Sequence, residues 1–345
     1  MVEHTRWRET ARRIADDTLF PAAAAVDGAD RAPSAHLGLL AAEGFYGIAA
    51  APENGGVGLH RFDVVADVVA SFAGGCLATT FIWIQHLGPL IAVGTIGAPG
   101  IRDRWLGPLA RGERRSGVAM AGVRPGPGRI HTRPAPGGFL VTGETTWVTG
   151  WGLIDTLLVG AVDDREVVHF FLMDAAPAAT LSVRPARLIA AQASSTVSMR
   201  FDNHFIPADR LGHTEPFADW SGGDAVGSAL NGFLAIGIAA RCARLLGTDE
   251  LSDDLAAARA ALLTTTPTEI PGARARASLL AVRAATQLLV QAGSRGVLAD
   301  QDAQRLYREA GFLLVFGSRP AIKDSMLQQL RSADRPAAVQ GSLVS

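Results

Sequence analysis

Trp147 and Thr149 form the pair in this sequence whose side chains could do the most specific chemistry. Together they could offer a flat apolar face and a hydroxyl group. A flat aromatic ligand with a hydrogen-bonding edge would need both from a protein. Taken alone, the pair is better explained by a tryptophan packed in the core of a β-domain and a threonine chosen as a β-former. The surrounding sequence must decide between the two interpretations.

Other residue types that often carry chemistry do not form a recognisable site. Cys76 and Cys242 are the two cysteines, too few and too far apart for a disulfide framework or a zinc cluster. We expect each to be a small buried hydrophobe. His131, His169 and His204 stand on or beside predicted strands without metal-ligand spacing, so we expect no metal site.

Hydrolase, nucleic-acid and membrane classes are also disfavoured. The Gly-Ser pairs at 293–294 and 317–318 lie in helical context and do not form a nucleophile elbow after a strand. A net charge of −1 gives no bulk attraction to nucleic acid or to an anionic membrane. Residues 1–9 are charged where a signal peptide needs an apolar segment, so we expect a cytoplasmic protein. The apolar stretch 229–240 is too short to span a bilayer and indicates a buried core helix.

The elements that must position any site follow the order helices, strands, helices. Residues 4–111 show helical periodicity and predict five helices. Short Val-, Thr- and Phe-rich runs between glycine and proline turns predict strands at 117–123, 139–146, 156–162, 167–173 and 196–205. Helical periodicity returns from residue 225. Because strands and helices do not alternate, a parallel βαβ core is disfavoured. We predict an α+β protein with an N-terminal helical domain (1–112), a central antiparallel β-domain (113–212) and a C-terminal helical bundle (213–345).

Four local stretches resemble the acyl-CoA dehydrogenase family, in the order and at roughly the spacing that the family uses. They are residues 44–58, with Gly44 and "PENGGVG"; residues 105–113, "WLGPLARGE"; residues 138–159, with "GFLVTG", "WVTG" and "DTLLV"; and residues 304–310, "QRLYREA". The third stretch is the strongest and contains Trp147 and Thr149. The four stretches span nearly the whole chain, and the resemblance implies the fold of that family with FAD as cofactor.

The resemblance also implies roles for individual residues. In the family, the aromatic residue at the position of Trp147 packs on the flavin, and the hydroxyl at the position of Thr149 bonds near N5. Arg295 could contact a cofactor phosphate or lie solvated at a helix end. The cofactor-binding residues that we expect from the resemblance are Met120, Gly122, Val123, Trp147, Val148, Thr149, Gly293, Arg295 and Ser318.

Two departures from the family pattern concern the cofactor. Val123 stands where the family has a threonine that contacts the flavin through side chain and backbone, so only the backbone contact can remain. The family's "R..FG" loop, which holds the adenosine half of FAD from a neighbouring subunit, is shortened or missing after Arg241 and Arg244. Retention of FAD is therefore an open question.

A third departure concerns the catalytic base. Dehydrogenases of this family remove an α-proton from an acyl thioester while hydride moves from the β-carbon to the flavin, and the proton needs a carboxylate. Phe316 occupies the usual position of that glutamate, and Gly227 occupies the other position used in the family. The acids nearby, Glu309, Asp324 and Asp224, are better explained as solvated, salt-bridged or structural residues. The identity of any catalytic base is therefore unknown.

The resemblance leaves three functions open. The first is an FAD-dependent oxidoreductase acting on acyl-CoA, on a carrier-bound acyl thioester or on a related small molecule. The second is a non-catalytic partner subunit that completes the FAD site of a Glu-bearing homologue. The third is a flavin-free biosynthetic protein on the same fold. The Ala-rich helix at 273–289 has apolar residues on more than one face, and family members dimerise there, so we expect a homodimer or homotetramer, or a hetero-oligomer with such a homologue.

Overall fold

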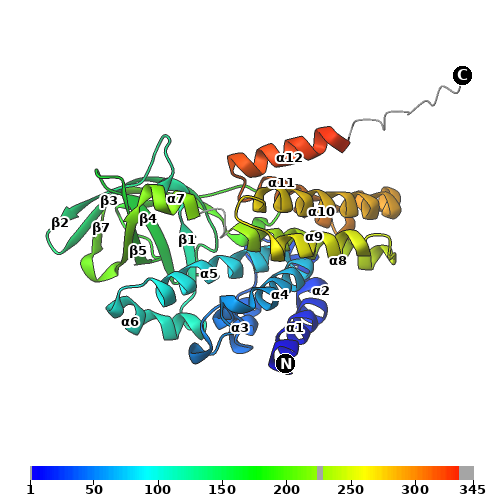
Figure 1. Cartoon of the computed structure of the whole chain (residues 1–345), viewed down its shortest axis with the longest axis horizontal. Helices are drawn as coiled ribbons and strands as arrows, with labels where there is room; N and C mark the ends of the chain where they lie inside the picture. Colours follow the sequence, from blue (N-terminus) through cyan, green and yellow to red (C-terminus); the bar gives the residue numbers. More distant parts are fainter. Residues whose placement is uncertain (1, 224–227, 334–345) are drawn as a thin grey trace, which may run out of the picture.

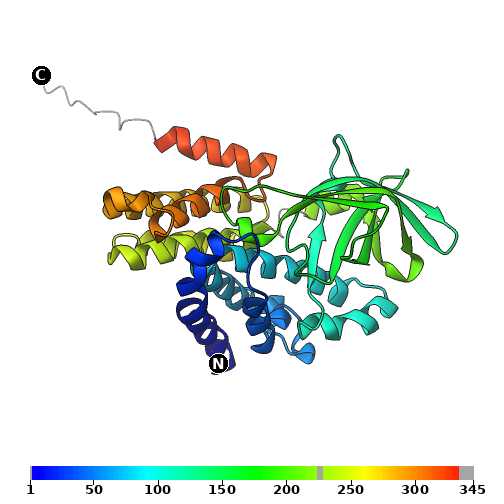
Figure 2. The same ribbon diagram turned by 180° about the vertical axis from the view of Figure 1, so that it is seen from behind.

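The computed structural model describes residues 2–223 and 228–333 and contains a β-domain beside two groups of helices (Figure 1). The N-terminal helices at residues 77–110 lie under the sheet, the earlier ones lie under the C-terminal helices, and the view from behind shows the same arrangement (Figure 2). This is the predicted fold class.

The N-terminal region is helical, as predicted. Its first helix runs without a break through a π-helical segment, and four further helices follow it. They are α1 (Val2–Ile14), η1 (Ala15–Leu19) and α2 (Phe20–Asp27), then α3 (Ser34–Ala42), α4 (Phe62–Gly75), α5 (Leu77–Thr95) and α6 (Pro99–Ala110). Counting α1 to α2 as one continuous helix, the region has the five helices that the periodicity predicts.

The β-domain is one eight-stranded sheet in which β6 and β8 are the edges. The strands are β1 (Ser116–Ala119), β2 (His131–Ala135), β3 (Gly138–Val148), β4 (Thr156–Val162), β5 (Val167–Asp174), β6 (Leu181–Pro185), β7 (Val197–Pro207) and β8 (Leu211–Pro216). Most pairings are antiparallel, as predicted, but β1 and one residue of β2 pair with β4 in parallel. β2 runs in the same direction as β1, β3 runs in the opposite direction, and the turn after β3 reverses the chain again, so β1 and β4 are parallel.

The predicted strand at 117–123 is shorter in the structure. β1 ends at Ala119, and residues 121–123 form the 3₁₀ turn η5 (Ala121–Val123). The N–H of Val123 donates to the Met120 carbonyl and the Gly122 carbonyl accepts from Ile130, so this segment bonds locally instead of extending the sheet ladder. β2, β6 and β8 were not predicted.

The C-terminal region is helical, as predicted. It contains α7 (Phe217–Gly223), α8 (Ala229–Leu246), α9 (Ser252–Thr264), α10 (Ile270–Ala292), η9 (Gly293–Val297), α11 (Asp302–Val315) and α12 (Pro320–Ala333). Strands thus occupy residues 116–216, and the predicted division of the chain at residues 112 and 212 stays a prediction.

One close helix contact joins the N-terminal and C-terminal regions. A Cβ atom on Gly237 of α8 would lie 2.1 Å from the Ala70 carbonyl oxygen of α4, and a Cβ atom on Gly74 would lie 2.8 Å from the Gly237 oxygen. Arg241 Nε donates to the Gly74 carbonyl at 2.6 Å. Glycine at both positions therefore lets the two backbones approach closely, and the two regions share one core.

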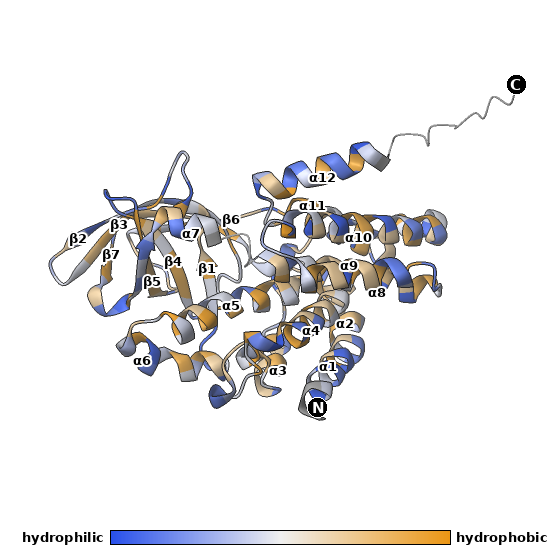
Figure 3. Cartoon of the chain, in the orientation of Figure 1, coloured by the Kyte–Doolittle hydropathy of each residue, from blue (hydrophilic) through white to orange (hydrophobic). Residues whose placement is uncertain are grey.

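Two apolar helices lie inside that core. α5 and α8 are long and apolar enough to cross a membrane, but 72% and 67% of their most apolar segments are buried within the protein. Figure 3 shows apolar residues concentrated along these helices and along the strands above α5. Burial of this kind is typical of the central helices of a folded domain.

His86 ties α5 to its neighbours. Its Nδ1 accepts from the Ser116 N–H at 3.0 Å, and its Nε2 donates to the Leu109 carbonyl at 3.1 Å. Burial lowers the pKa of His86 to about 3. The imidazole is therefore neutral and structural.

Candidate functional site

A cavity of about 480 Å³ lies where the β-domain meets the loop between α11 and α12. One side is aromatic, formed by Phe81 of α5 with Phe312 and Phe316. Trp147 at the end of β3 and Met120 after β1 line it as well. The cavity therefore brings together segments from all three regions of the chain.

Trp147 is placed by an irregularity in β3. The register of β3 against β7 shifts between Thr145 and Val148, and Trp147 has a left-handed backbone with φ 65°. Its side chain is 62% exposed, whereas the next residue, Val148, is fully buried. A bulky residue in this conformation costs about 1–3 kcal/mol and is a recurrent feature of functional sites. Trp147 is thus not part of the β-domain core.

The Thr149 hydroxyl is connected to the cavity through another residue. Thr149 is 1% exposed, and its Oγ1 shares a hydrogen bond with Thr196 Oγ1 at 3.2 Å. Thr196 in turn bonds Ser194 Oγ at 2.8 Å and lines the cavity. Sequence reasoning missed Thr196, because its contact with Thr149 joins residues 47 positions apart.

Phe316 packs within the aromatic side of the cavity. Its ring centroid lies 4.6 Å from that of Phe81 in an edge-to-face contact and 5.8 Å from that of Phe312 in a stacked contact. Its carbonyl accepts a hydrogen bond from Arg274 Nη2 at 3.1 Å. Among the described residues that line this cavity there is no Asp, Glu or His; the charged ones are Arg124 and Arg319.

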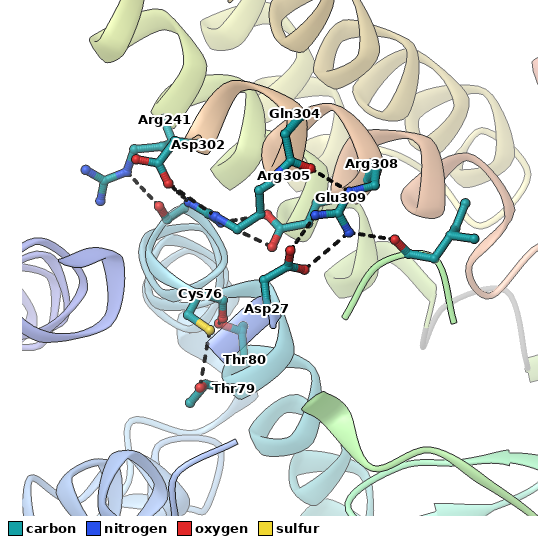
Figure 4. Close-up of polar contacts among 12 residues, drawn as sticks. Asp27, Cys76, Thr79, Thr80, Arg241, Asp302, Gln304, Arg305, Arg308 and Glu309 are labelled. Carbon is teal, nitrogen blue, oxygen red and sulfur yellow. Dashed lines mark hydrogen bonds and ion pairs between the residues drawn. The ribbon is translucent and has the colours of Figure 1, made fainter. Parts of the chain in front are cut away.

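Glu309 belongs to a separate buried network (Figure 4). Both of its carboxylate oxygens accept from Arg305 Nη1 at 3.1 Å, and Arg305 also bonds Asp302. Arg308 of the same helix pairs with Asp27 of α2. Burial raises the pKa of Glu309, and the charge of Arg305 opposes that shift. Glu309 is therefore a structural residue that does not line the cavity.

The other acids considered from the sequence do not supply a base in the described structure. Asp324 lies on α12 and borders a different surface hollow, together with Leu327 and Arg331. Gly227 and Asp224 lie outside the described residues.

Four further predicted cofactor contacts fall into two groups. Met120 and Ser318 line the cavity. Gly122 and Val123 are buried, and their backbone groups already have partners within the chain. The Val123 carbonyl accepts from Arg129 Nε at 2.9 Å. A backbone contact from Val123 to a ligand would have to compete with these bonds.

The residues predicted for the adenosine half do not meet this cavity within one chain. Gly293 and the exposed Arg295 stand in η9, after α10. Arg241 and Arg244 both pair with Asp16 of the π-helical segment. Those two arginines therefore serve the contact between the N-terminal and C-terminal regions.

The N-terminal third of the chain matches a known family. Residues 2–113 match the family described as "Acyl-CoA dehydrogenase, N-terminal domain". The bovine mitochondrial short-chain specific acyl-CoA dehydrogenase is 27% identical over 223 residues, which cover 60% of this chain and 52% of that protein. The chain thus spans about half the length of the curated relatives that it matches.

Solved structures share the whole fold. A glutaryl-coenzyme A dehydrogenase in complex with glutaryl-CoA has a TM-score of 0.84 at 16% identity, with 97% of this chain and 96% of that chain covered. The structure described as "PigA with FAD and proline" has a TM-score of 0.81 at 17% identity, with 96% and 98% covered. At these identities the similarity shows the fold alone.

Proposed function

We propose that the chain is a flavin-dependent oxidoreductase of the acyl-CoA dehydrogenase type. Residues 2–113 match the N-terminal domain of that family, and the whole chain has its fold. Its substrate would be an acyl thioester, free as acyl-CoA or held on a carrier, or a related small molecule. The glutaryl-CoA and FAD named for the two structural relatives support these two ligand classes.

The observation that carries the proposal is Trp147. An exposed indole that lines a cavity on a strained backbone is costly for a protein unless a ligand uses it. Trp147 and Met120 would flank the isoalloxazine ring, and the hydroxyl of Thr196, oriented by Thr149, would be available as a donor to its edge. FAD, when bound, supplies a hydride acceptor. These residues fit the isoalloxazine ring of FAD. The described residues form no comparable site for its adenosine half.

The aromatic side of the cavity suits an apolar acyl group. Phe81, Phe312 and Phe316 would exclude water from it and fix its position. None of them accepts a proton, and no carboxylate lines the cavity among the described residues. We therefore expect ordinary α,β-dehydrogenation to be very slow in the wild-type protein.

The same feature favours a second candidate function. A chain that binds FAD and has Phe316 in place of the base could be the non-catalytic subunit of a hetero-oligomer with a Glu-bearing homologue. Purification from the native source would distinguish the two functions. A stoichiometric second chain supports the subunit, and its absence supports an enzyme acting alone.

The direct test measures FAD binding. Purified wild-type protein should be yellow or bind FAD on titration. Trp147→Ala should weaken FAD binding by about tenfold or more, because an aromatic contact and its buried area are lost. Tyr307→Ala, which removes an exposed aromatic residue elsewhere on α11, is the matched control and should bind normally. A colourless wild-type protein that does not bind added FAD would refute the flavin proposal and favour the flavin-free alternative.

A further inference from the structure

Arg274 is a buried cation with unused hydrogen-bond donors. It lies on α10 and is 2% exposed. Its Nη2 donates to the Phe316 carbonyl, but Nε and Nη1 have no hydrogen-bond partner among the described residues. Among the described residues, the other two buried arginines, Arg241 and Arg305, are both paired with a carboxylate.

The charge on Arg274 persists at neutral pH. Burial, with a smaller contribution from the like charge of Arg319, lowers the pKa of Arg274 to about 10. The guanidinium therefore stays protonated. A buried charge without a counter-ion is strongly unfavourable, and an anion that pairs with it regains much of the cost.

The guanidinium does not line the cavity but lies next to one residue of its wall. Gly317 lines the cavity, and a Cβ atom on this residue would lie 3.5 Å from Arg274 Nη1. The same point is 3.7 Å from the amide nitrogen of Asn231 on α8. Two donors thus converge on the one residue of this loop that has no side chain. Gly317 also has a φ of 57°, a conformation that favours glycine.

We propose that Arg274, with Asn231 beside it, forms an anion subsite next to Gly317, reached from the cavity, and takes a carboxylate at the far end of the substrate's acyl group. This proposal rests on the proposed thioester function. The three phenyl rings require an apolar segment, and the cation beyond Gly317 requires a small anionic terminus. The substrate class is therefore a monothioester of a dicarboxylic acid.

The test compares two thioesters of similar chain length by calorimetric binding to the purified protein. Glutaryl-CoA ends in a carboxylate, and hexanoyl-CoA ends in a methyl group. Wild type should bind glutaryl-CoA at least about tenfold more tightly than hexanoyl-CoA, because hydrogen bonds to a charged group are stronger than neutral ones. Arg274→Met should lose this preference, and Arg274→Lys should keep part of it. Arg276→Met, which removes an exposed arginine of the same helix, should retain it.

Stability without ligand gives a second readout. If Arg274 lacks a counter-ion, Arg274→Met should unfold at an unchanged or higher temperature than wild type. A lower unfolding temperature together with unchanged ligand preference would mean that Arg274 only anchors the Phe316 carbonyl, and would overturn the subsite.

The outcomes separate this proposal from the proposed function. If wild type and Arg274→Met bind both thioesters equally, the subsite is refuted and thioester binding stands. If neither thioester binds wild type, thioester binding is refuted, and thermal shifts with glutarate decide the subsite. Glutarate should then raise the unfolding temperature of wild type and leave that of Arg274→Met unchanged. The absence of any shift in wild type would refute the subsite as well.

Discussion

Replacing Phe316 with glutamate should create the proton acceptor that the cavity lacks. The position lines the cavity, and its backbone is held by the bond from Arg274 to the Phe316 carbonyl. That bond does not involve the side chain, so the variant should keep the local backbone. A carboxylate here, with Arg274 and Arg319 nearby, should remain ionised and able to accept a proton.

The magnitudes follow from the contacts. The variant loses two ring contacts, at 4.6 Å and 5.8 Å, each worth about 0.5–1.5 kcal/mol beyond area burial. The free energy of unfolding should therefore fall by about 1–3 kcal/mol. General-base catalysis typically contributes about 10²- to 10⁴-fold in rate, and dehydrogenation of acyl-CoA should rise within that range if FAD is bound.

The assay is dye-coupled oxidation of a panel of acyl-CoAs by FAD-loaded wild type, Phe316→Glu and Phe316→Gln. The glutamine variant has the size of glutamate without its basicity and controls for the lost rings. Equal rates for the two variants would show that position 316 does not face the substrate α-carbon. Ordinary family rates in wild type would show that another residue is the base, and Asp224→Asn would be the next variant to measure.

Three further predictions concern stability and assembly. The folded-state pKa of His86, about 3, lies below the ordinary 6.5, so the unfolded chain binds the extra proton. The free energy of unfolding should then fall by a few kcal/mol as pH drops from about 6.5 to about 3, and in urea titrations His86→Gln should lose this dependence. Glu309→Gln should destabilise the fold by about 1.5–3 kcal/mol in urea, because Arg305 loses one of its two carboxylate partners and keeps Asp302, while turnover per folded molecule stays unchanged. Sedimentation should show a species larger than the 36.0 kDa chain, and Val290→Asp with Val297→Asp, at sites 75% and 76% exposed, should shift it toward monomer; a wild-type monomer at micromolar concentration would contradict this.

Most of the fold could be predicted from the sequence because long helices and central strands have strong periodic patterns. The strands that the sequence analysis did not predict have weak periodic patterns. β6 and β8 are the two edges of the sheet, and β2, β6 and β8 each contain a proline and charged or polar residues. Edge strands are half-solvated and tolerate such residues, so their alternation is poor.

The candidate site could be predicted only where a local motif marks it. The resemblance led to Met120, Trp147, Phe316 and Ser318, and the structure places all four on one cavity. That they bind FAD stays a prediction. Arg274 carries no local signal, because its importance comes from a contact with a residue 42 positions away and from the lack of a counter-ion. Burial and missing partners of this kind arise only when the chain is folded.

The contact between α4 and α8 has a consequence for how the chain folds during synthesis. The face of α4 around Gly74 is covered by α8 around Gly237, which is made more than 150 residues later. Because synthesis adds about 5–20 residues per second, that apolar face stays uncovered for on the order of 10–30 s before α8 is made. The residues 2–113 that match the family's N-terminal domain are thus a unit of sequence more than a unit of folding. A fragment ending at residue 113 should expose this face and aggregate, while the full-length chain should depend on chaperones for that interval.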